Sequence, residues 1–503
     1  MKCLPILWLV LTTTAIASDL PRRPNIVILY ADDLGYGDLG CYGTGSKIPT
    51  PNLDRLAGEG LRFTDAHSSS GICTPSRYAL LTGRYHWRKF HGIVNAFGGS
   101  VFSSERLTLP EMLRASGYRT ACIGKWHLGW NWEALKKPGA RPLKVERRNR
   151  GFAADAFDWS RPIPGGPLAH GFDHYFGDDV PNFPPYTWIE DDRILKAPTV
   201  PYLPDPAPAE GSPEGRPGPM AEGWKQDAVM PALTRHVVEW LGRQKDQDEP
   251  FFLYFPWTSP HAPIVPAPEY LGRTEVGGYG DFVHQSDHHA GQVLAALDVN
   301  GLGDDTLVIF TADNGPEHYA YPRAREHGHR SAGPLRGLKR DVWEGGHRVP
   351  FLVRWPGVVK PGTVSNSLVS QIDLMATLAE IVGFELPADA AEDSESLLAL
   401  LEGAKTGPRE ALVHNTFEGK WAIRVGSWLW IDAPNGQHTR VPEWYTEAED
   451  LPPDEGASAL FDLAEDLGQR VNIASGHPEV VQQLRSRLKR IRERGHSARR
   501  LDK

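Results

Sequence analysis

Two pairs of polar side chains follow segments that have the composition of buried strands. Asp32 and Asp33 come directly after one apolar run, and Asp313 and Asn314 come directly after another. Ligands of open α/β sheets gather at the carboxyl ends of the strands, so both pairs are expected at one edge of a sheet. The first pair alone fits a turn equally well, because Asp is a common turn residue. Together the four oxygen-bearing side chains suit Ca²⁺ or Mg²⁺ better than Zn²⁺, which prefers His and Cys.

Cys73 stands at the start of a segment, 74–82, that has a helical pattern. A helix N-terminus favours anions, because its free N–H groups and its dipole point toward them. The ordinary interpretation of a lone cysteine is a buried structural thiol, and this is what we expect of Cys41 and Cys122. Removal of Cys3 with a predicted leader leaves an odd number of cysteines, so no set of disulfides follows.

The stretch from Cys73 through Pro75 and Arg77 into Leu81-Thr82-Gly83-Arg84 resembles the signature of the type I, formylglycine-dependent sulfatases. The resemblance runs from Asn25 to about Gly383. Its further blocks follow in the family's order and are 31–38, 124–129, 260–263, 313–315, 337–339 and 344–346. Several blocks in one order are far more specific than a single motif. The segment that begins at 170–173 resembles arylsulfatases and N-acetylgalactosamine-6-sulfatases in particular.

The resemblance implies a modified residue and a metal. In this family the cysteine at the position of Cys73 is oxidised during export to Cα-formylglycine by a formylglycine-generating enzyme, which would account for the odd thiol. Together with modified Cys73, four residues would hold one Ca²⁺: Asp32, Asp33, Asp313 and Asn314.

The resemblance also assigns five basic residues to catalysis. A sulfate ester is an anion, and charge moves to the leaving oxygen as the S–O bond breaks, so positive charge must already be in place. Arg77 and Lys125 would hold the formylglycine and the sulfate. Three residues would surround the sulfate and handle protons: His127, His261 and Lys339. A hydroxyl of the hydrated aldehyde would attack sulfur, His261 or Lys339 would protonate the departing alcohol, and His127 would take a proton as sulfate leaves.

Loops over the strand ends are expected to select the substrate, a sulfated carbohydrate or an aryl sulfate. The candidate loops are 170–173, 178–186 and 317–330, and the candidate substrate-binding side chains are His170, Asp178, Asn182 and Tyr186. Six other histidines are expected on the surface: His284, His288, His289, His318, His327 and His329.

Two other functions remain open for this sequence. One is a phosphoesterase of the wider superfamily, but such enzymes use Ser or Thr as the nucleophile and usually two Zn²⁺ ions, whereas Cys73 and oxygen ligands are found here. The other is a catalytically inactive, sulfatase-like carbohydrate-binding protein, which the complete set of catalytic residues argues against.

The elements that must position these residues alternate along the chain. Apolar runs predict strands at 25–30, 119–123, 251–255, 306–311 and 350–355, and apolar spacing predicts helices at 52–59, 109–116, 226–245, 281–298 and 371–382. This alternation predicts an α/β fold with a mostly parallel sheet sandwiched by helices. The resemblance implies that the fold is alkaline-phosphatase-like.

The pattern of apolar residues along the chain changes after about residue 385. Runs at 421–431 and 459–463 predict antiparallel strands, and apolar residues from 481 to 491 mark a final helix. We therefore expect a catalytic domain over 18–385 and a smaller C-terminal subdomain over 386–503. The proline-rich segment 198–219 is expected to be a surface loop, since eight prolines in 22 residues exclude a central strand or helix.

Length, charge and the N-terminus restrict the class of protein. The chain has 503 residues with 54 basic and 63 acidic side chains, a net charge of −9, which argues against a general nucleic-acid binder. Residues 1–17 resemble a secretory signal ending in a small-x-small pattern, so we expect a secreted or periplasmic protein. No later segment has the ~20 apolar residues that a membrane span needs.

Overall fold

The structure is a computed structural model that describes residues 23–502, apart from 44, 142, 145–149, 204–206 and 454–455. The predicted secretory signal at 1–17 lies outside the described residues. Within the described part, no helix is both long and apolar enough to cross a bilayer.

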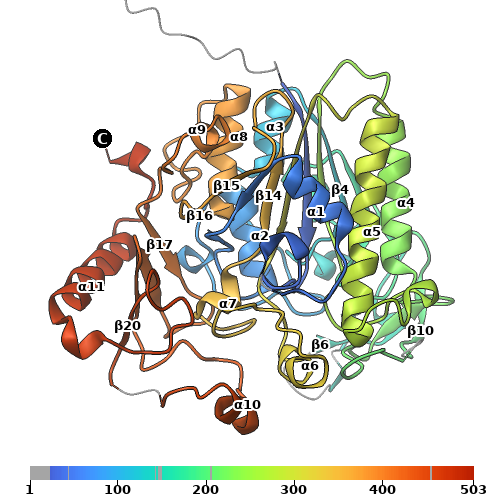
Figure 1. The fold of residues 1–503 in the computed structure, drawn as a ribbon. Coiled ribbons are helices and arrows are strands. Elements are labelled where there is room, and N and C mark those ends of the chain that lie inside the picture. Colours follow the sequence, from blue (N-terminus) through green and yellow to red (C-terminus); the bar gives the residue numbers. More distant parts are fainter. Residues whose placement is uncertain are drawn as a thin grey trace, which may run out of the picture.

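A ten-stranded sheet forms the centre of the molecule (Figure 1). Its five central strands are parallel and lie in the order β13 (Thr306–Ala312), β1 (Asn25–Ala31), β12 (Phe251–Pro256), β4 (Arg119–Lys125) and β7 (His174–Asp179). Beyond β13 lie β14 (Phe351–Arg354), β2 (Leu61–Phe63) and β15 (Thr363–Ser365), and beyond β7 lie β8 (Ile189–Glu190) and β9 (Arg193–Ile194). The five predicted strands are all present, although β14 runs antiparallel to its neighbours.

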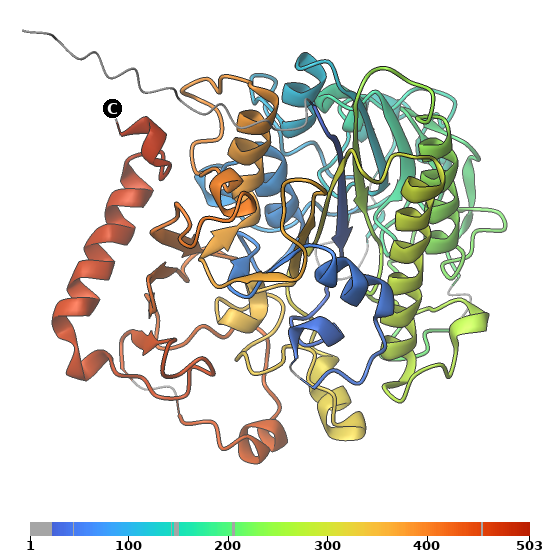
Figure 2. The ribbon, with the colours of Figure 1, turned by 45° about the horizontal axis from the view of Figure 1, so that its top comes forward.

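Both faces of the sheet are covered, as the continuous apolar runs predict. Ile26 and Ile28 of β1 belong to the core on one face, and Val27 and Leu29 belong to the core on the other. The first face is covered by α2 (Cys73–Thr82), α3 (Leu109–Ala115) and α8 (Leu374–Val382). The second is covered by α1 (Pro51–Gly58), α4 (Val229–Gly242) and α5 (Gly277–Val299), of which α4 and α5 lie side by side (Figure 2).

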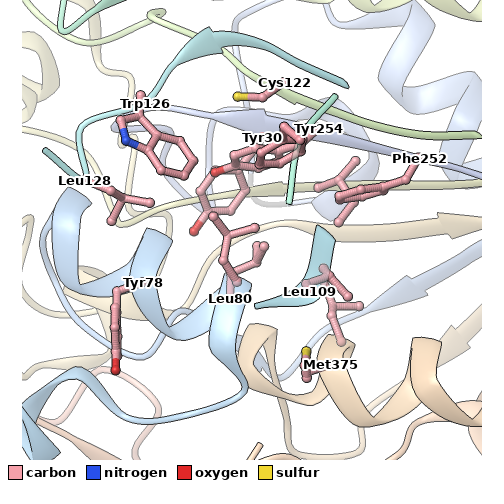
Figure 3. Close-up of a cluster of buried hydrophobic side chains, with 14 of the residues drawn as sticks. Tyr30, Tyr78, Leu80, Leu109, Cys122, Trp126, Leu128, Phe252, Tyr254 and Met375 are labelled. Carbon is pink, nitrogen blue, oxygen red and sulfur yellow. The ribbon is translucent and has the colours of Figure 1, made fainter. Parts of the chain in front are cut away.

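The core beneath the site is dense and aromatic. Tyr30 of β1, Leu80 of α2, Leu109 of α3 and Met375 of α8 converge in it (Figure 3). A fully buried leucine, methionine or phenylalanine contributes about 1.5–3 kcal/mol to folding. The helix that carries Cys73 is therefore held rigidly, because all of its residues are buried.

The proline-rich segment returns toward the sheet instead of projecting from the molecule. Its ends pair as a two-stranded ribbon of β10 (Pro198–Pro201) and β11 (Pro219–Ala221), outside the main sheet. Two further short pairs are β3 (Ala66–His67) with β16 (Val369–Ser370), and β5 (Leu143–Lys144) with β6 (Arg150–Gly151).

The C-terminal part has its own antiparallel sheet. Its strands are β17 (Ala411–His414), β18 (Ala422–Val425), β19 (Trp428–Ile431) and β20 (Ala459–Asp462). The run 421–431 is a hairpin of two strands, and α11 (Pro478–Glu493) packs Leu484 and Leu488 against the sheet (Figure 2). The remaining short helices are α6 (Ala320–His327), α7 (Glu344–His347), α9 (Leu398–Leu401) and α10 (Glu443–Ala448).

Candidate active site

The polar pairs meet at the carboxyl ends of the central strands. β1 and β13 are parallel with Ala31 opposite Ala312, so Asp32 and Asp313 leave the sheet at the same level. The backbone N–H of Asp33 donates to Oδ1 of Asp313 at 3.2 Å. The register of this strand pair therefore brings the two acids together, as expected for residues that follow parallel strands.

The acidic group has the donor atoms of a metal site. Ligand atoms of Asp32, Asp33, Cys73 and His261 all lie within 4.8 Å of one another. Asn314 donates from Nδ2 to Asp33 Oδ1 at 2.7 Å, while its own Oδ1 is buried and accepts no hydrogen bond from a described residue. Burial raises the pKa of Asp33, which a nearby cation would reverse. Carboxylate oxygens with an unpartnered amide oxygen fit a hard divalent cation.

Each carboxylate has a basic side chain within hydrogen-bonding distance. Lys125 Nζ lies 2.5 Å from Asp32, Arg77 Nη2 lies 2.8 Å from Asp313, and Lys339 Nζ lies 2.7 Å from Asp33; all six side chains are buried. Burial is the largest single effect and opposes the charge of each lysine, but the acidic groups around it together outweigh burial, so the pKa values of Lys125 and Lys339 are raised. Three positive charges are thus fixed at the bottom of the site.

Cys73 is the first residue of α2 and is 3% exposed. Its Sγ lies 3.6 Å from Oδ1 of Asp32. Burial and then the charge of Asp313 raise the pKa of the thiol, so an unmodified Cys73 is neutral at physiological pH. Because the thiolate is the reactive form of cysteine, the thiol itself is a poor nucleophile here.

His127 presents one free ring nitrogen. Nε2 lies 3.0 Å from the carbonyl oxygen of Val94, which can only accept, so Nε2 carries the proton. Nδ1 is buried and has no described partner. The residue has a left-handed backbone with φ 54°, held by Thr74 Oγ1 donating to its carbonyl at 2.8 Å and by its N–H donating to Asp179 at 3.2 Å. Burial and Lys125 lower the pKa of His127, so its ring is neutral.

His261 is oriented in the opposite sense. Its Nδ1 lies 2.5 Å from the carbonyl oxygen of Ala262, so Nδ1 is the protonated nitrogen of the neutral ring. Nε2 faces the acidic group, 3.7 Å from Oδ2 of Asp33. Burial, followed by the charge of Lys339, lowers the pKa of His261 to about 3.

Two of the four candidate substrate-binding residues lie beside His127. Asp178 and Asn182 are buried, and their side-chain oxygens have no described partner. Phe183, next to Asn182, meets the His127 ring edge to face at 5.5 Å. Burial and the neighbouring Asp179 raise the pKa of Asp178 to about 7. Unpartnered buried oxygens at this point are available to a ligand.

The side chains of the other two candidates, Tyr186 and His170, are engaged by other residues of the protein. Tyr186 donates its hydroxyl to the carbonyl of Arg216 at 2.7 Å, and its ring stacks on Tyr202. His170 packs against Phe102 and pairs through Nε2 with Ser100 at 3.2 Å. In the structure both side chains already pack against other residues of the chain.

Two histidines expected on the surface are buried. His329 pairs through Nε2 with Oδ1 of Asp38 at 2.8 Å, and His289 pairs with Gln285 and Gln292. The surface expectation for these two is wrong, because each side chain has hydrogen-bond partners that make burial tolerable. The partner of His329 is remote in the chain and leaves no local pattern, whereas both partners of His289 lie on neighbouring turns of the same helix.

Two acids near the site were not singled out by the sequence. Glu317 contacts Arg340 with both carboxylate oxygens and lies 3.6 Å from Lys339 Nζ. Asp179 ends β7 and holds the backbone of His127. An available signal for Asp179 was its position at the end of a central strand, the same position that identified Asp32.

Family comparisons agree with this geometry. A sequence model of the sulfatase family matches residues 24–384, and one described as N-sulphoglucosamine sulphohydrolase, C-terminal, matches residues 338–494. The chain is 34% identical over 506 residues to an N-acetylgalactosamine-6-O-sulfatase of Bacteroides thetaiotaomicron, covering 94% of each protein. It is 34% identical over 485 residues to human arylsulfatase A, covering 92% of this chain and 87% of that protein.

Solved structures share the fold. A Bacteroides thetaiotaomicron structure from work on the metabolism of multiple glycosaminoglycans has a TM-score of 0.79 and 32% identity, covering 94% of this chain and all of that one. The phosphonate monoester hydrolase of Agrobacterium radiobacter has a TM-score of 0.57 at 19% identity, covering 94% of this chain and 96% of that one, a likeness of fold alone. The predicted alkaline-phosphatase-like architecture is confirmed.

Proposed function

Since the chain belongs to the sulfatase family and hydrolyses sulfate monoesters, we propose that it acts on a sulfated carbohydrate, with Cys73 converted to formylglycine beside one calcium ion. The observation that carries the proposal is the approach of Cys73 Sγ to Asp32 at 3.6 Å, within a buried group of three carboxylates and three basic side chains. No other described cysteine lies in such a group, since Cys41 and Cys122 pack among apolar residues.

The acidic group fits calcium in chemistry and in number. Four oxygen donors would hold the ion: Asp32, Asp33, Asp313 and Asn314. The unpartnered Oδ1 of Asn314 supports this assignment, because a buried amide oxygen without a hydrogen-bond donor is costly unless a cation meets it. When bound, calcium would supply positive charge that stabilises the oxygens of the sulfate ester and of residue 73.

The position of residue 73 supports its modification. A neutral thiol buried at the start of a helix offers no thiolate to attack sulfur. An aldehyde hydrate at the same carbon would supply a hydroxyl as the nucleophile and a second hydroxyl through which the sulfate can be released. The conversion requires an enzyme that oxidises the cysteine, and we include a formylglycine-generating enzyme among the partners of this chain.

Three side chains supply fixed positive charge for the sulfate. Lys125 and Lys339 stay charged because the several acidic groups around each of them together outweigh the effect of burial. Arg77 is fixed by Asp313 and by the carbonyl of Lys125, which accepts from Nη1 at 3.2 Å. Charges that need no rearrangement stabilise the developing negative charge of the leaving oxygen most effectively.

The two histidines would serve opposite proton transfers. Nδ1 of His127 has a free lone pair and therefore accepts a proton. Nε2 of His261 faces the site while Nδ1 is tied to a carbonyl, so a proton carried at Nε2 can be passed to the departing alcohol. The anionic sulfate ester favours that proton at Nε2. Lys339 lies next to His261 and remains an alternative donor.

A sulfated sugar is the substrate class that the relatives favour. Two relatives of this chain are named N-acetylgalactosamine-6-O-sulfatase and arylsulfatase A, and one similar solved structure comes from work on glycosaminoglycan metabolism. Unpartnered oxygens of Asp178 and Asn182 beside His127 would accept hydrogen bonds from sugar hydroxyls. We therefore retain these two as substrate-binding residues.

We also propose that residues 1–17 direct export, and that the catalytic domain ends near residue 385. The sulfatase match ends at residue 384 and supports that boundary, although the second match begins at residue 338 and overlaps it.

One comparison tests the modification of Cys73 and the reaction together. Protein made with and without a coexpressed formylglycine-generating enzyme is compared for release of sulfate from nitrophenyl sulfate and from N-acetylgalactosamine 6-sulfate. We expect activity only where mass spectrometry finds the peptide containing 72–77 lighter by about 18 Da, the mass lost when a thiol becomes an aldehyde. Full activity from the unmodified cysteine, or a higher kcat/KM on nitrophenyl phosphate than on the sulfate, would contradict the proposal.

A further inference from the structure

A positively charged side chain stands near His127 without a carboxylate partner. Arg216 belongs to the proline-rich segment, and its guanidinium carbon lies 3.6 Å from the centre of the Phe183 ring. Nη1 donates to the amide Oδ1 of Asn95 at 3.2 Å. Among the described residues, no carboxylate oxygen lies within 4.0 Å of its side-chain nitrogens, so its charge is met only by neutral groups.

Both partners of Arg216 belong to the surroundings of His127. Phe183 meets the His127 ring edge to face, and Asn95 follows Val94, whose carbonyl fixes His127 Nε2. The guanidinium is therefore one side chain away from a residue that we assign to the reaction. It lies on the side of the site where Asn182 is found.

The backbone of Arg216 is fixed as firmly as its side chain. Its N–H donates to the carbonyl of Asn182 at 3.1 Å, and its own carbonyl accepts from the hydroxyl of Tyr186 at 2.7 Å. Tyr186 is in turn stacked on Tyr202. The segment thus holds the guanidinium in place before any ligand binds, which reduces the entropy lost on binding.

The charge of Arg216 has no ion-pair partner among the described residues. Partial burial lowers its pKa to about 10, so the side chain remains protonated at neutral pH. The nearest acid that acts on it is Glu214, whose Oε1 already accepts a hydrogen bond from the hydroxyl of Tyr319. A half-buried charge without a counter-ion is unfavourable, and an anion bound beside it would remove that cost.

A cavity adjoins Asn95, the hydrogen-bond partner of Arg216. This cavity of about 560 Å³ is lined by residues 89–96 and 98–101, which include Asn95 and Lys89. No described carboxylate lies within 4.0 Å of the Lys89 amine. A volume of several hundred Å³ is enough for a sugar unit next to the one in the site. Lys89 lines this space, and Arg216 adjoins it through its hydrogen bond to Asn95. A neighbouring unit of a longer chain in this space would lie beside Asn95, the partner of Arg216.

We propose that Arg216 binds a second anionic group of the substrate, a carboxylate or a sulfate on the sugar next to the one that is cleaved. This inference rests on the proposed function and makes the preferred substrate a polyanionic oligosaccharide. The planar guanidinium matches the two oxygens of either group, and an arginine is the residue best suited to such paired contacts.

The test compares kcat/KM of the modified enzyme and of Arg216→Gln on three substrates. These are N-acetylgalactosamine 6-sulfate, a disaccharide in which a uronic acid adjoins that sugar, and a disaccharide in which the adjoining sugar has no carboxylate and carries a second sulfate instead. We expect the substitution to lower the ratio of kcat/KM for an anionic disaccharide to that for the monosaccharide by about tenfold, mainly through KM. The disaccharide that shows this loss identifies the bound group as carboxylate or sulfate.

Two controls separate the inference from the proposed function. Arg193→Gln removes an exposed arginine of β9 and should leave the ratio unchanged. Binding of both disaccharides is also measured by calorimetry to unmodified Cys73→Ala protein, with and without Arg216→Gln, so that the result does not depend on turnover. Equal losses on all substrates would make Arg216 a packing residue, and an unchanged affinity would overturn the inference. A wild-type enzyme that releases no sulfate from any ester would instead overturn the proposed function.

Discussion

Acidic and basic side chains alternate in contact around Cys73. Asp32 contacts Lys125 and Asp33 contacts Lys339, so each charge is compensated although the group is buried. Removing one partner of a buried ion pair leaves the other unpaired, which destabilises a protein by several kcal/mol. A loss of activity after substitution of one of these residues would therefore reflect unfolding as well as loss of catalysis. Cys73 and His261 are better targets, because neither carries a structural charge in the unmodified, ligand-free protein.

Replacement of Cys73 by Ala should abolish turnover and preserve the fold. Sγ makes one long contact, to Asp32 at 3.6 Å, and the alanine side chain fits the same space. We expect kcat to fall by at least about a thousandfold, as for other removed nucleophiles, with the circular dichroism spectrum retained. Calcium binding, measured by calorimetry, should weaken only modestly because four oxygen ligands remain. An unfolded variant would show that Cys73 has a structural role.

Replacement of His261 by Ala should depend on the leaving group. Protonation by Nε2 matters for a sugar alcohol, which is a poor leaving group, and matters little for nitrophenolate. We expect a loss of about 10²–10⁴-fold in kcat for a sugar sulfate, and a much smaller loss for nitrophenyl sulfate. Rates on a series of aryl sulfates of increasing leaving-group pKa test this. A loss that is constant across the series would assign proton donation to another residue, with Lys339 as the first alternative.

At the scale of elements, Gly345 allows α7 to approach closely the loop that carries Lys339. Gly345 lies in α7, and a Cβ atom on it would stand 2.1 Å from the carbonyl oxygen of Gly337, two residues before Lys339. The contact is between two backbones, so neither side can move away without displacing the loop that holds Lys339.

Gly345→Ala should therefore lower activity more than an ordinary surface change. The added methyl group forces a backbone shift that costs about 1–3 kcal/mol and moves Lys339 away from the sulfate. We expect a lower Tm together with a loss in kcat of tenfold or more, about 1.4 kcal/mol for each factor of ten. Gly58→Ala in α1 is the matched control, since nothing lies within 4 Å of its Cβ position and alanine favours the helix. Equal activity of the two variants would contradict this account.

The elements that were predictable from sequence are those with local patterns. The apolar runs predicted β1, β4, β12, β13 and β14 but not β7. The reciprocal cap of Thr108 and Glu111 that begins α3 is likewise a local pattern, with its two residues three apart in the chain. The acid pairs were predicted to meet because parallel strands end at one edge. The position of Arg216 was not predictable, because it depends on contacts with Asn95 and Phe183, which are far away in the chain. Burial of His329 was missed for the same reason.

At the scale of the whole molecule, a buried group of histidines lies between the two-stranded sheet of β3 and β16 and the C-terminal antiparallel sheet. His67 of β3, His347 of α7 and His414 of β17 lie together, with a ring separation of 3.5 Å between the parallel rings of His347 and His414. Their ligand atoms and those of Glu344 lie within 4.8 Å of one another. Two parallel, stacked rings share no point that lies in both ring planes, which a metal bound by both would require. The group is better suited to neutral packing.

Charged residues surround these rings on every side. Asp65 and Glu344 carry the negative charges, and Arg348 and Arg424 bridge them with contacts of 3.0–3.5 Å. The carboxylates are therefore already paired with arginines. Burial lowers the pKa of His347 to about 3, and burial and then His347 lower that of His414 well below its usual value. The nearby Arg409 adds to the effect on His414.

Acidification should consequently loosen the junction between the two sheets. Both histidines are neutral in the folded protein but gain a proton below pH ~6.5 when unfolded, so stability is lost as pH falls from about 6.5 toward 3. Each contributes about 1.4 kcal/mol per pH unit within that window. Urea unfolding of wild type and His414→Gln at pH 7, 6 and 5 measures this, and we expect the variant to show a shallower loss by about that amount. His288→Gln, on the exposed side of α5, should leave the slope unchanged. Identical slopes for His414→Gln and wild type would mean that His414 is already charged in the folded protein, or that this junction does not limit stability in acid.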